Sequence, residues 1–272
     1  MIASPLPVLY ISHGAPLFAI EAGSTGPALT RWGEDLLQRP ENGLRGIVIM
    51  SPHWMARAPA VMSNPAPATL HDFGGFPAEL YELQYPAAGS PALAAEVLGL
   101  LKDAGMAADS DPERPLDHGA WVPLMHLFPQ ANVPVVQVAL PVDAGPAQVL
   151  AMGRALGSLR SRGVLVVGSG SMTHNLREFF GGAREPAPYV LEFSRWVEAA
   201  IARGDKAALL DYRRQAPHAQ RAHPSEDHFL PLFFALGAAG WGDEDAVQAD
   251  YLSREVMYGI LAMDSFALAQ AA

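Results

Sequence analysis

PVLYISHGAP, residues 7–16, is the stretch of this sequence that decides the fold. Residues 8–11 form a short apolar run of β-forming side chains between turn residues, which predicts a fully buried strand. Ser12, His13 and Gly14 then end the run, so His13 lies just past the carboxyl end of a core strand. Ligands of open α/β sheets bind at that edge, which makes His13 a candidate site residue.

The same arrangement recurs twice along the chain. In GIVIMSPHW, residues 46–54, an apolar run leads into His53, and the strand predicted at 164–168 leads through a Gly/Ser-rich turn to His174. A single histidine in such a place is more often a hydrogen-bonded core residue. Histidines in matching positions favour a shared metal site instead.

Two further histidines are expected at the starts of helices. His118 precedes a predicted helix over 120–128, and His228 falls in the first turn of an apolar helix, after Ser225 as a candidate N-cap. Helix starts point to the carboxyl edge of the sheet when the crossovers are right-handed. Five of the nine histidines therefore converge on one edge in this prediction, whereas His126, in the body of its helix, is expected to be a packed or surface residue without a site role.

Strand and helix patterns alternate through most of the chain. The sequence therefore predicts a single α/β domain over residues 1–272, with a central, mostly parallel sheet flanked by helices and a metal site at the strand carboxyl edge. Further helices are expected at 27–38, 91–104, 147–159, 188–202 and 205–212, and further strands at 58–62, 133–140, 247–252 and 258–268.

A long segment over residues 63–91 has little periodicity and many Pro, Gly and aromatic residues. Loops of that length inside a compact domain usually carry function. The segment offers pocket walls, although the same rings could simply fill the core beneath it. The candidates are Phe73, Phe76, Tyr81 and Tyr85, with His71 as a polar group among them.

Composition narrows the class of protein. The chain has 272 residues, 50% of them hydrophobic, and a net charge of −10, so its surface is expected to repel nucleic acid and anionic membranes. Without cysteine, a metal must be held by His, Asp or Glu. No signal peptide or membrane span is recognisable, and a cytoplasmic protein is expected. A homo-oligomer is possible on the sequence.

The residues leave the metal and the reaction open. Three imidazoles suit Zn(II) with an open position, whereas two histidines with a carboxylate, such as Asp227 or Glu226, suit a non-haem Fe(II) oxygenase. Ser169 and Ser171 could act as nucleophiles, but GSGSM lacks the spacing of a nucleophile elbow.

Six ordered motifs resemble those of the class III extradiol ring-cleaving dioxygenases, and most closely the DOPA 4,5-dioxygenase-type branch. The resemblance spans residue 11 to about residue 236. The motifs are SHGAP (12–16), SPHW (51–54), HDFGGFPAELYELQYPAAGSP (71–91), LDHGAW (116–121), GSGSMTHNL (168–176) and HPSEDHFLPL (223–232).

The resemblance implies one divalent metal per chain. This metal is Fe(II) for activity, or Zn(II), which some members of this branch carry. It also implies O2 as co-substrate and a small aromatic diol as substrate. His13 and His53 match two metal ligands, and His228 matches the third, where other branches use Glu. His174 matches the catalytic base, with a fourth-ligand role as the other expectation, and His118 matches a histidine that hydrogen-bonds the oxygen adduct. A Zn-dependent hydrolase, a non-catalytic metal-dependent binding protein and a structural zinc site remain the alternatives.

Overall fold

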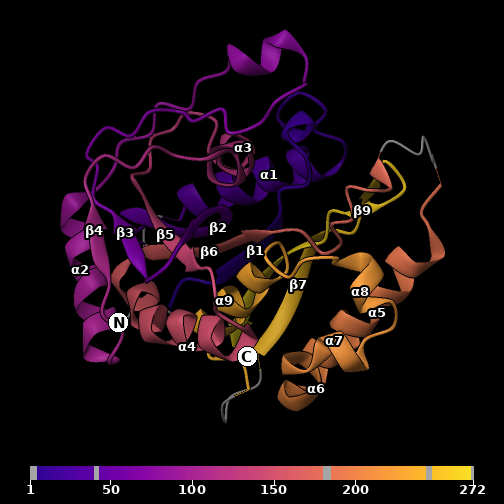
Figure 1. The fold of residues 1–272 in the computed structure, drawn as a ribbon. Helices are drawn as coiled ribbons and strands as arrows, with labels where there is room; N and C mark the ends of the chain where they lie inside the picture. Colours follow the sequence, from indigo (N-terminus) through magenta and orange to yellow (C-terminus); the bar gives the residue numbers. More distant parts are fainter. Residues whose placement is uncertain (1–4, 40–42, 180–184, 243–246, 271–272) are drawn as a thin grey trace.

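The computed structural model describes residues 5–39, 43–179, 185–242 and 247–270. Its centre is an eight-stranded sheet that joins both ends of the chain, because β1 and β10 are neighbours (Figure 1). In spatial order the strands are β4 (Asp109–Asp111), β3 (Ala60–Met62), β5 (Val135–Pro141), β2 (Gly46–Ala56), β6 (Val164–Gly170), β1 (Val8–Ser12), β10 (Ser265–Gln270) and β7 (Val247–Ser253).

The four central strands, β5, β2, β6 and β1, are all parallel. Antiparallel pairing is confined to the flanks, where β10 joins β1 and β7, and β3 joins β5. Successive residues of the central strands point to opposite faces, and both faces are buried: Val48 and Val166 lie in one core, Ile47 and Leu165 in the other. This explains why the strands read as continuous apolar runs, and it confirms the predicted α/β sheet.

Helices cover both faces of the sheet (Figure 1). Helices α1 (Thr25–Leu37) and α3 (His118–Leu127) pack on one face, and α9 (Leu230–Ala238) and α4 (Pro146–Leu156) on the other. The second face continues into α2 (Pro91–Asp103) and α5 (Pro188–Ala202). The remaining helical elements are α6 (Lys206–Leu210), α7 (Tyr212–Gln215), α8 (Ala219–Ala222) and the 3-10 turns Pro16–Ala19, Ala78–Tyr81 and Gly157–Arg162.

The predicted strand over 258–268 is broken in two, and its first residues are not a strand. Tyr258 and Gly259 both have positive φ, 53° and 69°. After them, β9 (Leu261–Ala262) pairs with β8 (Val256–Met257) in a small hairpin, and β10 begins separately at Ser265. The predicted helix over 205–212 is also shorter, because α6 ends at Leu210.

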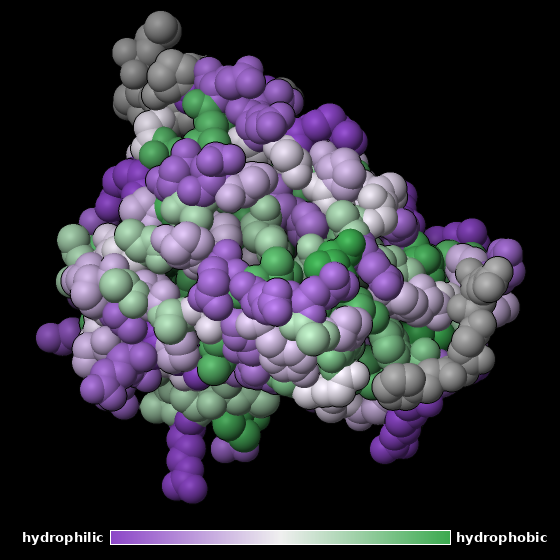
Figure 2. Space-filling view, turned by 90° about the horizontal axis from the view of Figure 1, so that it is seen from above, coloured by the Kyte–Doolittle hydropathy of each residue, from purple (hydrophilic) through white to green (hydrophobic). Residues whose placement is uncertain are grey.

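The described surface carries large hydrophobic side chains at scattered positions, such as Ile20, Met55 and Val142. In the view of Figure 2, hydrophobic residues form patches interrupted by hydrophilic ones. Of the helices that the structure describes, none combines the length and apolarity that crossing a membrane requires.

Candidate active site

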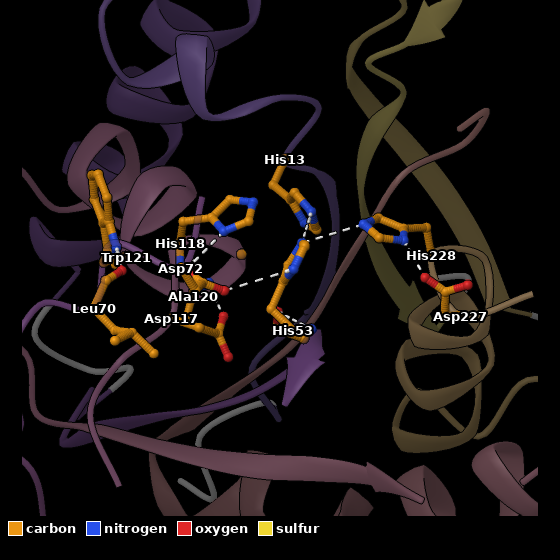
Figure 3. A network of polar contacts seen from close by, with 12 residues as sticks. His13, His53, Leu70, Asp72, Asp117, His118, Ala120, Trp121, Asp227 and His228 are labelled. Atoms are coloured by element: carbon orange, nitrogen blue, oxygen red, sulfur yellow. Dashed lines mark hydrogen bonds and ion pairs between the residues drawn. The ribbon is translucent and has the colours of Figure 1, made fainter. Parts of the chain in front are cut away.

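Three histidine nitrogens meet at the carboxyl edge of the sheet (Figure 3). Nε2 of His53 lies 3.2 Å from Nε2 of His13 and 3.2 Å from Nε2 of His228. All three nitrogens lie within 4.8 Å of one another. Imidazole nitrogens at this spacing could hold a metal ion between them.

The opposite nitrogen of each ring faces an acceptor. Ser169 Oγ donates to the carbonyl of Gly119, so it accepts from His13 Nδ1 at 3.0 Å. His228 Nδ1 donates to Asp227 Oδ2 at 2.5 Å. His53 Nδ1 faces Asp72 Oδ2 at 3.7 Å. Protons on Nδ1 of His13 and His228 leave the Nε2 lone pairs of these two rings for a cation, which is the usual outer support of metal-binding histidines, while His53 Nδ1 lies near a carboxylate.

The sequence predicts that His53 follows its strand, but in the structure His53 lies within the strand. Strand β2 continues to Ala56, and its pairing with β5 shifts register between Ser51 and Met55. This irregularity re-aims the side chain, as β-bulges beside active sites do. Gly119 makes room for it, because a Cβ there would lie 2.8 Å from His53 Cδ2.

His228 lies in a turn before α9 rather than in the first turn of the helix. The helix begins at Leu230 with Phe229 as N-cap and no side-chain capping bond, so the predicted cap at Ser225 is wrong. The turn is fixed from the sheet instead: Ser171 N donates to His228 O at 2.8 Å. A Cβ on Gly170 would lie 2.3 Å from that same carbonyl oxygen, so this approach needs glycine.

His174 lies beside the three-nitrogen group but not in it. Its ring stacks on that of His228, with centroids 3.5 Å apart and planes 7° apart. Its backbone N–H donates to Ala222 O at 2.8 Å, and burial lowers the pKa of His174 to about 4. His174 is therefore a neutral imidazole at the edge of the group at pH 7.

His118 is the first residue of α3, and the preceding Asp117 caps that helix by accepting from Ala120 N. The His118 ring lies 3.8 Å from the His53 ring, centroid to centroid. Its backbone N–H and its Nδ1 both bond Asp72 Oδ1, at 3.0 and 2.9 Å. The predicted convergence of His118 on this edge is confirmed.

Asp72, whose carboxylate lies beside His118 and His53, is a site residue that the sequence does not predict. It contacts Nδ1 of His118 and faces Nδ1 of His53. Burial alone would raise the pKa of Asp72, but the hydrogen bonds and charge of His118 outweigh it and lower the pKa to about 2. The only sequence signal was a carboxylate beside His71 in a long loop, which carries no information about a partner 46 residues away.

The site combines neutral rings with anionic supports. Burial, and then repulsion from the neighbouring histidines, holds the pKa values of His13 and His228 well below their usual range. Burial also lowers the pKa of His53, to about 3. Unprotonated imidazoles backed by the carboxylate of Asp72 favour a bound cation over a bound anion.

A cavity of about 320 Å³ opens above the histidines. Of the predicted aromatic walls, Phe73 and Phe76 line it. Tyr85 does not, because it is buried in the core and donates to Phe128 O at 3.2 Å. The full lining comprises Gly14, Ala15, Pro16, His53, Phe73, Gly74, Phe76, His118, His174, Leu176, Phe179 and His228. Tyr81 and His71 are likewise absent from it.

Two other residues singled out in the sequence have supporting or packing roles. Ser169 is fully buried, and its hydroxyl is held between His13 and Gly119, so it is no nucleophile. His126 packs against Phe18 and bonds its carbonyl at 2.8 Å, so of the two expected positions, packed or surface, it takes the packed one.

Known proteins resemble this chain over most of its length. Residues 7–263 match the family described as the catalytic LigB subunit of aromatic ring-opening dioxygenase. The chain is 37% identical to a 4,5-DOPA dioxygenase extradiol of Beta vulgaris over 233 residues, which cover 85% of this chain and 86% of that protein. It is 34% identical to a protein of the same description from Escherichia coli K12, over 91% of this chain and 89% of the relative.

A solved structure has the same architecture. The crystal structure of an uncharacterized protein from Escherichia coli K12 superposes with a TM-score of 0.78 at 29% identity, covering 96% of this chain and 99% of that one. The extent of the family match and the identity to its relatives show the family directly. The chain belongs to the LigB family and is an extradiol ring-cleaving dioxygenase.

Proposed function

We propose that this enzyme opens the ring of a catechol-type substrate with O2, using one divalent metal held by His13, His53 and His228. The convergence of three Nε2 atoms below an aromatic-lined cavity carries the proposal. A cavity of about 320 Å³ accommodates a single substituted ring above the nitrogens. The DOPA substrate named for the relatives is itself a catechol.

The donor set fits a divalent metal. Hydrogen-bond acceptors fix the rings of His13 and His228 through the opposite nitrogen, and the Asp72 carboxylate lies 3.7 Å from Nδ1 of His53. Three protein ligands on a tetrahedral or larger coordination shell leave positions for other ligands, as catalytic sites require. A divalent metal held by these three histidines would lower the pKa of the catechol hydroxyls and would bind both the diol and O2.

His174 is suited to the role of general base. It lines the cavity next to His228, and burial keeps its imidazole neutral at pH 7, so that a ring nitrogen can accept a hydroxyl proton. We assign His174 to deprotonation of the diol rather than to a fourth metal bond.

His118 and Asp72 act together on the other side of the cavity. Asp72 holds Nδ1 of His118, which leaves Nε2 for the substrate side, where a hydrogen bond to reacting oxygen offsets developing charge. Asp72 also faces His53 Nδ1, so it is a positioning residue for one metal ligand and one cavity histidine.

The reaction balances without a further reductant. One carbon–carbon bond next to the diol breaks, the O–O bond breaks, and both oxygen atoms enter the product. O2 is reduced and the two ring carbons are oxidised, which gives a muconic semialdehyde. The protein contributes orientation, proton transfer and the exclusion of water by Phe73 and Phe179.

The test is metal reconstitution. The purified protein is stripped with a chelator, reloaded anaerobically with Fe(II) or Zn(II), and mixed with 4-methylcatechol in air-saturated buffer. We expect a yellow ring-opened product with Fe(II), its loss in His53→Ala, and its retention in His126→Ala, a packed histidine outside the site. Ester cleavage by the Zn(II) form without O2 uptake by the Fe(II) form would overturn the proposal in favour of a hydrolase.

A further inference from the structure

We infer that the site prefers catechols whose ring substituent is apolar and uncharged over catechols that carry a carboxylate or an ammonium group there. The inference rests on the proposed function and specifies its substrate class. It is carried by the chemistry of the cavity walls.

Two apolar segments form the walls above the histidines. Phe73 and Phe76 come from the loop over 63–90, with ring centroids 5.6 Å apart. Leu176 and Phe179 come from the segment after β6, where Phe179 packs against the Tyr258 ring at 5.0 Å. A substrate whose diol lies at the histidines places its substituent against these side chains.

The walls offer no partner for a charged substituent. Among the described residues, no Asp, Glu, Lys or Arg lines the cavity, and its only side chains that can hydrogen-bond are the four histidines at the diol end. A carboxylate or ammonium there loses hydration without compensation. The nearest supports, Asp72 and Asp227, lie behind histidines and have the same sign as a substrate carboxylate.

A cation lies close by, in a separate cavity. Arg177 and Asn175 line an adjoining cavity of about 290 Å³. His174 and Leu176 line both cavities, so the two adjoin. The inference places the substituent in the aromatic cavity and not against Arg177, which makes Arg177 the sharpest check on it.

The experiment compares kcat/KM of the Fe(II)-loaded enzyme in two sets of catechols. One set is an alkyl series of increasing length, and the other contains charged analogues of 4-propylcatechol. From catechol through 4-methyl- and 4-ethyl- to 4-propylcatechol, we expect a rise of about fourfold per buried methylene until the cavity is filled. Against 4-propylcatechol we expect losses on the order of 100-fold for 3-(3,4-dihydroxyphenyl)propanoate, dopamine and L-DOPA, because each buries a charge. A flat alkyl series, or a charged analogue equal to 4-propylcatechol, would overturn the inference.

Two neighbouring variants locate the effect. Leu176→Arg places a cation on the wall and is expected to raise the propanoate-to-propyl ratio of kcat/KM at least about tenfold. Leu176 is 49% exposed, so the longer side chain fits without repacking the core. Arg177→Gln, the matched control, is expected to leave that ratio and the activity on 4-propylcatechol unchanged. A selective loss of propanoate turnover in Arg177→Gln would show that the carboxylate reaches Arg177 and would contradict the inference.

Failure of the proposed function is distinguishable from failure of the inference. If no catechol in the series is opened, the proposed reaction is wrong. Calorimetric titration of the Zn(II)-loaded protein with 4-propylcatechol and with the propanoate then still measures the preference. Equal affinity for the two would refute the inference, and tighter binding of 4-propylcatechol would support it.

Discussion

Asp72→Asn removes a negative charge from behind two histidines while keeping the shape of the side chain. In the native site, Asp72 Oδ1 lies 2.9 Å from His118 Nδ1, and Oδ2 lies 3.7 Å from His53 Nδ1. The hydrogen bonds and charge of His118 lower the pKa of Asp72 to about 2, so the ionised carboxylate is the form that the site favours. We expect Asn to lose most of that interaction.

The loss has two consequences. His53 becomes a weaker and less well oriented metal ligand, so we expect the metal Kd to rise about 10- to 100-fold. With saturating metal, kcat is still expected to fall because His118 is no longer fixed. Asp72→Glu keeps the charge and is expected to recover part of the affinity.

The assay is Zn(II) competition against a chromophoric chelator, followed by kcat and KM at saturating Fe(II). Asp109→Asn is the control, since it removes an exposed carboxylate from β4 at the sheet edge. The melting temperature of the metal-free protein separates a folding defect from a site defect. If Asp72→Asn binds Zn(II) within twofold of wild type and keeps its kcat, Asp72 does not position these histidines.

Three further predictions follow from the site. His174→Ala is expected to bind one metal per chain but to lose about 10²- to 10⁴-fold in kcat, measured against metal content; full activity would refute the assignment of the base. With chelator present, the free energy of unfolding is expected to fall by at least about 2 kcal/mol per pH unit between pH 6 and 5. In the unfolded chain the pKa of a histidine is near 6.5, whereas in the folded protein the pKa of His53 is about 3 and that of His174 is about 4. A free energy of unfolding that does not change with pH, measured by denaturant titration, would contradict this. Gly119→Ala puts a Cβ 2.2 Å from Ser51 Oγ and 2.8 Å from His53 Cδ2, so we expect about 1–3 kcal/mol of destabilisation and weaker metal binding, with the open Gly99→Ala as control.

The sequence predicts the sheet and the histidine edge because both depend on short-range patterns. A short apolar run of β-forming residues between turn residues, such as residues 8–11, predicts a buried strand. A residue that follows such a strand is expected at the carboxyl edge of the sheet. His13 and His118 lie where that reasoning places them, at a strand end and a helix start.

What the sequence does not predict depends on contacts between distant segments. The irregular pairing that keeps His53 within β2 is set by β5. The turn that delivers His228 is set by its hydrogen bond from Ser171 and by the glycine at 170, not by a cap at Ser225. Whether a loop aromatic lines the cavity, like Phe73, or fills the core, like Tyr85, depends on the packing of the whole loop.

The central claim is that one substrate ring receives both atoms of O2 at the three-histidine site. The most direct test supplies the Fe(II)-loaded enzyme with ¹⁸O2 and 4-methylcatechol, and traps the product at once with borohydride so that the aldehyde oxygen cannot exchange with water. Mass spectrometry is expected to find two heavy oxygen atoms in the ring-opened product of the wild type and no product from His13→Ala. A product with one heavy atom, or with none, would contradict the account.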